Sequence, residues 1–61
     1  MSYAEAKEIA LLRLELRACW DLGDRQGARA ALARLWELVR GSTEADPELA
    51  REVRRWDCKL A

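Results

Sequence analysis

The sequence contains no histidine and no phenylalanine, and it has one proline. Without histidine, the chain lacks the commonest general base and a common metal ligand, and it cannot form a Ser-His or Cys-His nucleophile pair. Its carboxylates alternate with arginines at helical spacing, as solvated ion-pairing faces do. No glycine-rich phosphate-binding loop is present. We therefore expect a protein that is not an enzyme and that uses no cofactor or metal.

Cysteine is also scarce, because Cys19 and Cys58 are the only two and no CxxC spacing joins them. Cys19 falls in an apolar stripe beside Trp20, which predicts a small buried hydrophobic residue. Cys58 falls outside the apolar face of its helix, so we expect it to be exposed or to touch a neighbouring chain. An intramolecular disulfide and a four-cysteine metal site shared by two chains are the alternatives that the pair leaves open.

Long apolar runs are missing as well. No stretch approaches the roughly 20 apolar residues of a membrane span. Arg13, Glu15 and Arg17 interrupt the segment that follows the N-terminal residues, which is unlike a signal peptide. We therefore expect a cytoplasmic protein with no membrane partner, in which both cysteines stay reduced.

The residues that are abundant favour helices. Alanine, leucine, arginine and glutamate dominate, whereas threonine and isoleucine occur once each and valine twice. A composition of 51% hydrophobic and 36% charged residues is typical of a globular chain. At 61 residues, the chain hides only about 60% of the surface that its unfolded form exposes. We predict one all-α domain over residues 1–61 that needs a staple, a metal or a partner.

Capping residues divide this domain into helices. We expect three, over about residues 3–22, 25–40 and 47–59. Ser2, with Glu5 three residues later, forms the sequence of a capping box. Gly23 supplies the left-handed backbone that ends the first helix, and Asp24 caps the second. Because the connection between them is so short, the first two helices should form an antiparallel hairpin.

The third helix has its own start and end signals. Gly41 ends the second helix, and Asp46 followed by Pro47 provides an acidic cap and a proline at the first helical position. Cations gather towards the end of the third helix, where they favour its dipole. The longer connection over residues 41–46 leaves the third helix more freedom than the hairpin turn leaves the second.

The first helix differs from the others because it has two opposed apolar faces. The second and third helices each have one, formed by Ala28, Ala31, Leu32, Leu35, Leu38 and Val39 and by Leu49, Val53, Trp56 and Leu60. One face of the first helix contains Ile9, Leu12, Leu16, Cys19 and Trp20. The opposite face contains Leu11, Leu14, Ala18 and Leu22.

Two interpretations explain the double face. Either the second and third helices cover one face each, or one face contacts another chain. We favour the second, since opposed faces fit poorly with two neighbours inside one compact bundle, and a leucine left in water forgoes about 1.5–3 kcal/mol. The predicted protein interface comprises Leu11, Leu14, Ala18 and Leu22, with the amphipathic ring of Trp36 at its rim. The expected partner is a second copy, in a homodimer or a larger homo-oligomer, with a different protein as a further possibility.

The segment LRACWDLGDRQGARAALARLWEL, residues 16–38, resembles the turn and second helix of a tetratricopeptide-type hairpin. The Gly23-Asp24 pair, Ala28, and the large apolar Leu32 and Leu35 stand where that family has a turn, a small residue and large apolar residues. The chain departs from the family at Glu15-Leu16, where Leu-Gly is usual, and at Arg40, where proline is usual. It also holds fewer than two repeats. The resemblance implies a helical hairpin that binds peptides or proteins without catalysis.

The function that these features favour is a small adaptor, chaperone-like or regulatory protein that acts through helix-helix contacts and self-association. The alternative is a nucleic-acid-binding regulator that uses Arg51, Arg54 and Arg55 of the third helix. Eleven basic residues balance eleven acidic ones, so a net positive field that would attract phosphates is missing and nucleic acid is the less expected partner. A fragment of a helical array and a designed helical assembly are further readings that the sequence leaves open.

Overall fold

The structure, a computed structural model, describes residues 2–40 and 47–61. These residues form three α-helices: α1 (Tyr3–Leu22), α2 (Arg25–Arg40) and α3 (Pro47–Leu60). The predicted all-α, three-helix architecture is confirmed. α3 runs one residue further than predicted and ends on the buried side chain of Leu60. The caps predicted at Gly41 and Asp46 lie outside the described residues.

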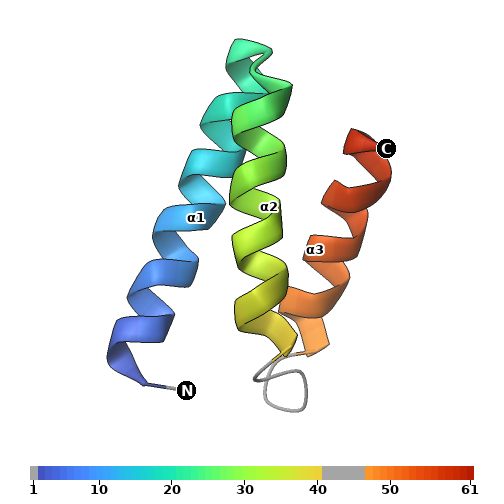
Figure 1. Cartoon of the computed structure of the whole chain (residues 1–61). Coiled ribbons are helices and arrows are strands. Elements are labelled where there is room, and N and C mark those ends of the chain that lie inside the picture. The colour runs from blue at the N-terminus through green and yellow to red at the C-terminus, as the bar shows by residue number, and fades with distance from the viewer. Residues whose placement is uncertain (1, 41–46) are drawn as a thin grey trace.

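Local hydrogen bonds build the predicted hairpin. The Glu5 amide donates to Ser2 Oγ over 3.2 Å at the start of α1. At its end, Gly23 has φ +76°, and the Gly23 and Asp24 amides donate to the carbonyls of Trp20 and Cys19 over 3.1 and 2.8 Å. Asp24 Oδ1 then accepts from the Gly27 amide over 3.0 Å. The chain therefore reverses within two residues, and α2 returns alongside α1 (Figure 1).

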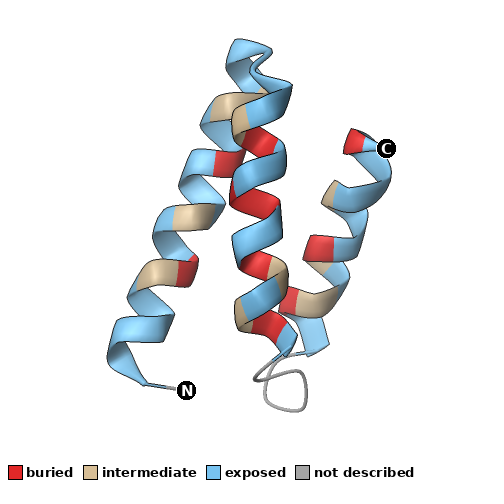
Figure 2. Cartoon of the chain, in the orientation of Figure 1, coloured by how far each residue is buried: buried red, intermediate tan, exposed pale blue. Residues whose placement is uncertain are grey.

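α2 is the central helix, with α1 on one flank and α3 on the other (Figure 1). Among the described residues, no Cα atom of α1 lies within 8 Å of a Cα atom of α3. Figure 2 shows the consequence: buried residues recur along α2 and lie on the sides of α1 and α3 that face it. The core comprises Ile9, Leu16, Ala28, Ala31, Leu32, Leu35, Val39, Leu49, Val53 and Leu60. α3 therefore packs on α2 and leaves most of α1 uncovered.

Long side chains connect α1 with α3 where the backbones stay apart. Arg13 Nε and Nη2 contact the two carboxylate oxygens of Glu52 over 2.9 and 3.1 Å. The rings of Trp20 and Trp56 meet edge to face, with centroids 5.7 Å apart, and Lys59 Nζ lies 4.7 Å from the Trp56 centroid. These contacts hold α3 in place beside the hairpin. No helix formed by residues 2–40 or 47–61 is both long and apolar enough to cross a membrane.

Candidate protein interface on the first helix

The face of α1 that points towards α2 belongs to the core. Leu16 is fully buried and Ile9 nearly so, while Leu12, Cys19 and Trp20 are half-buried against the same core. Cys19 lies close to Gly27, because a Cβ atom added to this glycine would come within 2.9 Å of the Cys19 sulfur. The absence of a side chain at Gly27 thus lets the two helices approach closely beside their turn.

The opposite face of α1 is uncovered. Leu11, Leu14 and Leu22 expose 54%, 68% and 83% of their surface, and Ala18 is also exposed. We call Leu11, Leu14, Ala18 and Leu22 the outward face. The interpretation in which the second and third helices cover one face each is wrong, because α3 packs against α2 instead. An isolated chain therefore leaves an apolar stripe in water along most of the length of α1.

Two further residues extend this stripe towards the N-terminus, and the sequence analysis missed both. Tyr3 is 83% exposed, and Lys7 is exposed between Tyr3 and Leu11. The three positions are four residues apart, so each step along α1 turns by only about 40°. The four-residue spacing could have indicated that Tyr3 and Lys7 belong to the stripe. Tyr3 is the first residue of its helix, however, and Lys7 is charged although its stem is aliphatic.

Trp36 lies elsewhere. It is half-buried on α2, where it lines a pocket of about 250 Å³ with α2 residues and with Asp57, Leu60 and the C-terminal Ala61. A second, shallow hollow beside it is formed by α2 residues alone. The ring therefore faces the α3 side of α2, and the structure does not bring Trp36 to the rim of the outward face as predicted.

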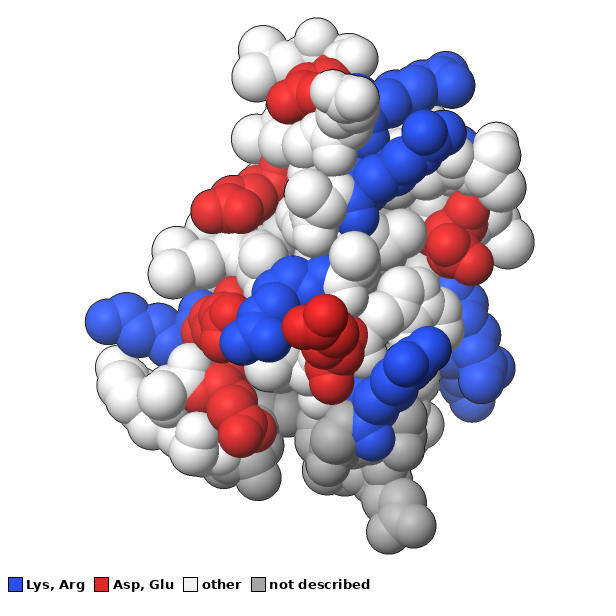
Figure 3. Space-filling view, in the orientation of Figure 1, with Lys and Arg blue, Asp and Glu red and all other residues white. Residues whose placement is uncertain are grey.

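Ion pairs border the outward face on one side. The Arg34 guanidinium bridges the helices of the hairpin, with Nε 2.7 Å from Glu8 Oε2 and Nη1 3.0 Å from Glu37 Oε2. Its hydrogen bonds lower the pKa of Glu8, and the two carboxylates raise the pKa of Arg34. Over the face seen in Figure 3, positive and negative side chains are interspersed. The charge of Arg34 is thus compensated by the carboxylates beside it.

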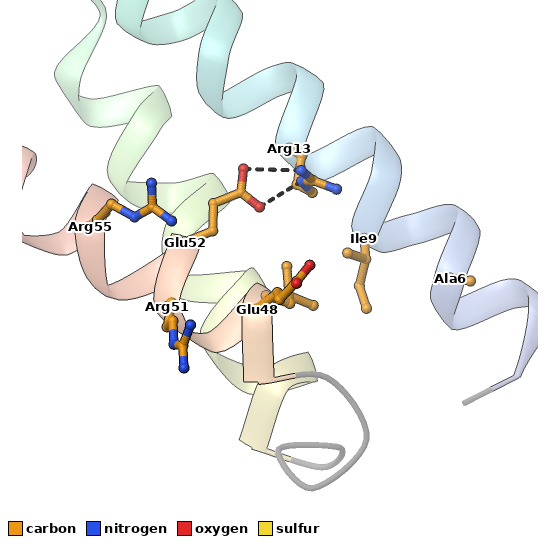
Figure 4. Close-up of a pocket in the computed structure, with 8 residues that line it drawn as sticks. Ala6, Ile9, Arg13, Glu48, Arg51, Glu52 and Arg55 are labelled. Carbon is orange, nitrogen blue, oxygen red and sulfur yellow. Dashed lines mark hydrogen bonds and ion pairs between the residues drawn. The ribbon is translucent and has the colours of Figure 1, made fainter.

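A furrow of about 580 Å³ follows the seam between α1 and α3 (Figure 4). Ile9 and Leu49 contribute its apolar lining, while Arg51 and Arg55 point towards it from α3. The three arginines considered for nucleic-acid binding are all exposed: Arg51, Arg54 and Arg55. Glu52 stands among them and is held by Arg13, so the seam carries both signs of charge.

The described residues contain no cluster of three acidic or cysteine side chains that could hold a metal ion. Both cysteines are free thiols, with Cys58 exposed and Cys19 half-buried. No protein-family model matches the chain, and comparison with curated proteins and with solved structures finds no match either. The resemblance to a tetratricopeptide-type hairpin thus stays a prediction.

Proposed function

We propose that this protein is a small adaptor, chaperone-like or regulatory protein that acts by helix-helix association through the outward face and that it associates with itself. The observation that carries the proposal is the exposure of Leu11, Leu14 and Leu22 on one side of α1. These are the only leucines among the described residues that are exposed. Because they fall on a single stripe instead of being scattered, one flat helical partner could cover all three together.

Size supports the same proposal. A single core in a chain of 61 residues supplies only about 3–5 kcal/mol of stability, so association is a common way to stabilise such domains. In a homo-oligomer both chains contribute the same apolar stripe, which doubles the surface removed from water. The free energy gained by this burial must exceed an association cost of about 4–15 kcal/mol. A short stripe contributed by one chain alone would meet that cost less easily.

The proposal assigns no catalytic role. The chain has no histidine, and the carboxylates with the clearest geometry, Glu8 and Glu52, are each occupied by an arginine. Cys58, although exposed, has no histidine anywhere in the chain to activate it. The function that remains is binding.

Light scattering across a dilution series tests the proposal with a matched pair of variants. Ala18 and Ala30 are both exposed helical alanines, but Ala18 lies on the outward face and Ala30 on the far side of the hairpin, on α2. Ala18→Glu should convert the protein to monomers, since it places a charge in the stripe, whereas Ala30→Glu should leave the oligomer intact. Leu14→Glu should repeat the effect of Ala18→Glu. A wild-type chain that is monomeric up to millimolar concentration, or equal behaviour of the two alanine variants, would refute the proposal.

Salt separates apolar association from the nucleic-acid alternative. Binding to phosphates weakens by orders of magnitude between low and moderate salt, whereas the burial of leucines tolerates salt. The oligomer should therefore persist at 0.5 M sodium chloride. An Arg54-dependent affinity for duplex DNA that falls steeply with salt would favour the alternative instead.

A further inference from the structure

The exposed apolar residues of α1 are symmetric about the centre of the helix. α1 spans Tyr3–Leu22, so its midpoint lies between residues 12 and 13. Tyr3 and Leu22, each 83% exposed, are equally far from that midpoint, and Leu11 and Leu14 are equally near to it. Lys7 and Ala18 form a third equidistant pair. A two-fold axis through this midpoint would therefore place each of these side chains level with its equidistant counterpart in a second copy.

From this symmetry we propose that two copies form an antiparallel homodimer in which α1 pairs with α1 along the outward face. The inference rests on the proposed function and adds the partner, the direction and the register. Leu11 of each copy lies level with Leu14 of the other, and these four leucines form the centre of the interface. Lys7 lies level with Ala18 of the second copy, while Tyr3 and Leu22 close the two ends.

Charge placement selects the antiparallel direction. Lys7 stands near the start of the stripe and Asp21 near its end, at one edge. In a parallel pair, the two Lys7 side chains would lie level with each other on the stripe, which places like charges together, and each Lys7 would be far along the axis from Asp21. In the antiparallel pair, the stem of Lys7 crosses Ala18 of the second copy, and Asp21 of that copy lies three residues further, about 4.5 Å along the axis. The ammonium group can reach that carboxylate, which pairs with Arg17 of its own helix over 3.5 Å, so Lys7 would be the second cation beside it.

The shape of the monomer leaves room for this pairing. α2 packs on the opposite side of α1, and the backbone of α3 stays away from α1 (Figure 1). Glu52 and Trp56 of α3 reach only the edge of the outward face, in a hollow that Leu14 also lines, and Leu14 keeps 68% of its surface exposed. Ala4, Ala10 and Ala18 are exposed on or beside the stripe, and such small side chains allow helices to approach to about 8–10 Å. A helix of 20 residues is about 30 Å long, close to the 31 Å longest dimension of the molecule. The paired helices would thus use the full length of the protein.

Pulsed dipolar spectroscopy between spin labels measures the direction directly. Asp21 is exposed near the end of α1, and Ala4 is exposed near its start. Nitroxide labels are attached to Asp21→Cys or to Ala4→Cys in a Cys19→Ala, Cys58→Ser background, after circular dichroism shows that the background keeps its helices. In the antiparallel dimer, two Ala4 labels should lie about 25 Å apart along the helix axis, whereas a parallel dimer would place them level with each other. A mixture of chains labelled at Ala4 and chains labelled at Asp21 should add a distance much shorter than that.

The outcomes test the direction in which the two α1 helices pair separately from self-association itself. A short distance between two Ala4 labels would overturn the antiparallel register, while the self-association proposed above would stand. A sample with no intermolecular distance, monomeric by light scattering, would overturn both. A dimer that shows the long Ala4 distance but ignores Leu14→Glu would place the contact on another surface and would also overturn the inference.

Charge exchange gives a second test with a solution readout. Lys7→Glu should raise the dissociation constant roughly two- to fivefold for each of the two symmetric ion pairs. Adding Asp21→Lys to the same chain should restore the affinity, because the attraction returns with its signs exchanged. In a parallel dimer the second change would restore nothing. Arg54→Glu on α3, an exposed cation remote from the stripe, serves as the control and should leave the dissociation constant unchanged.

Discussion

The inward and outward faces of α1 carry the same kind of side chain in opposite surroundings. Leu16 is completely buried, whereas Leu14, two residues earlier on the same helix, exposes 68% of its surface. The difference comes from the rest of the chain, since the turn at Gly23 and Asp24 lays α2 on one side of α1 and nothing in the described residues returns to the other. The sequence of α1 therefore shows that it has two apolar faces, whereas the fold decides which of the two is buried.

α2 explains why α3 does not supply that cover. It packs against both neighbours at once, and its Leu32 lines a pocket together with Asp57 and Leu60 of α3. α3 has one apolar stripe, buried at Leu49, Val53 and Leu60, and it uses that stripe on α2. The side-chain ends of Arg13 and Trp20 reach Glu52 and Trp56 across the gap between the outer helices. α1 is thus left with one buried face and one that is exposed in the single chain.

The largest expected effect compares the two leucines directly. Leu16→Ala removes a fully buried side chain and should cost about 2–5 kcal/mol of unfolding free energy, enough to unfold much of a domain of this size. Leu14→Ala should change the stability of the dilute monomer by no more than about 0.5 kcal/mol, because its side chain contacts mostly water. Urea unfolding followed by tryptophan fluorescence checks both variants.

The protein concentration in that experiment sharpens the comparison. At concentrations where the chain self-associates, Leu14→Ala should begin to lower the apparent stability, since the oligomer stabilises the folded state by mass action. The effect of Leu16→Ala should persist at every concentration. If Leu14→Ala destabilised the dilute monomer as strongly as Leu16→Ala, the distinction between the two faces would be wrong.

A smaller effect should follow from weakening the turn at Gly23 and Asp24, which lays α2 against the inward face of α1. Asp24 Oδ1 accepts the Gly27 amide at the start of α2, so Asp24→Ala should cost about 0.5–2 kcal/mol in thermal or urea unfolding. Asp24→Asn keeps the capping oxygen and should stay close to wild type. Neither change touches the outward face, so the dissociation constant between folded chains should not move. A variant that altered self-association without altering stability would instead implicate the turn in the interface.

Capping residues made the hairpin predictable from sequence, because Ser2, Gly23 and Asp24 act through neighbours only a few residues away. The position of α3 was not predictable, since the six residues between α2 and α3 in the sequence are too many to fix its direction and its contacts are remote along the chain. Trp36 shows this limit. Its position on the helical wheel predicted a place at the edge of the apolar face of α2, but the packing of α3 decides that it lies on the α3 side and not beside the outward face. On the outward face, spacing identified the leucines, whereas Tyr3 was recognised only from its exposure.

The smallest expected effect concerns the ion pair at the border between the two faces. Hydrogen bonds from Arg34 lower the pKa of Glu8 below its ordinary value of 4.5 in the folded protein, so the ionised carboxylate favours folding. This contribution is fully present above pH 4.5, and it is lost as the pH falls through the folded-state pKa. Both side chains remain partly exposed to water, so the effect should be slight and should shrink with added salt.

Stability measured against pH tests this with a matched pair of variants. Glu8→Gln should flatten the stability curve below pH 4.5, and Glu15→Gln controls for the loss of one carboxyl charge at an exposed position in the middle of the same helix. The pair fastens α1 to α2 only, so the dissociation constant of the oligomer should be the same for Glu8→Gln and wild type at pH 7. A shift in that constant would mean that the border of the inward face also belongs to the outward contact, and the two faces of α1 would then be less independent than their exposures indicate.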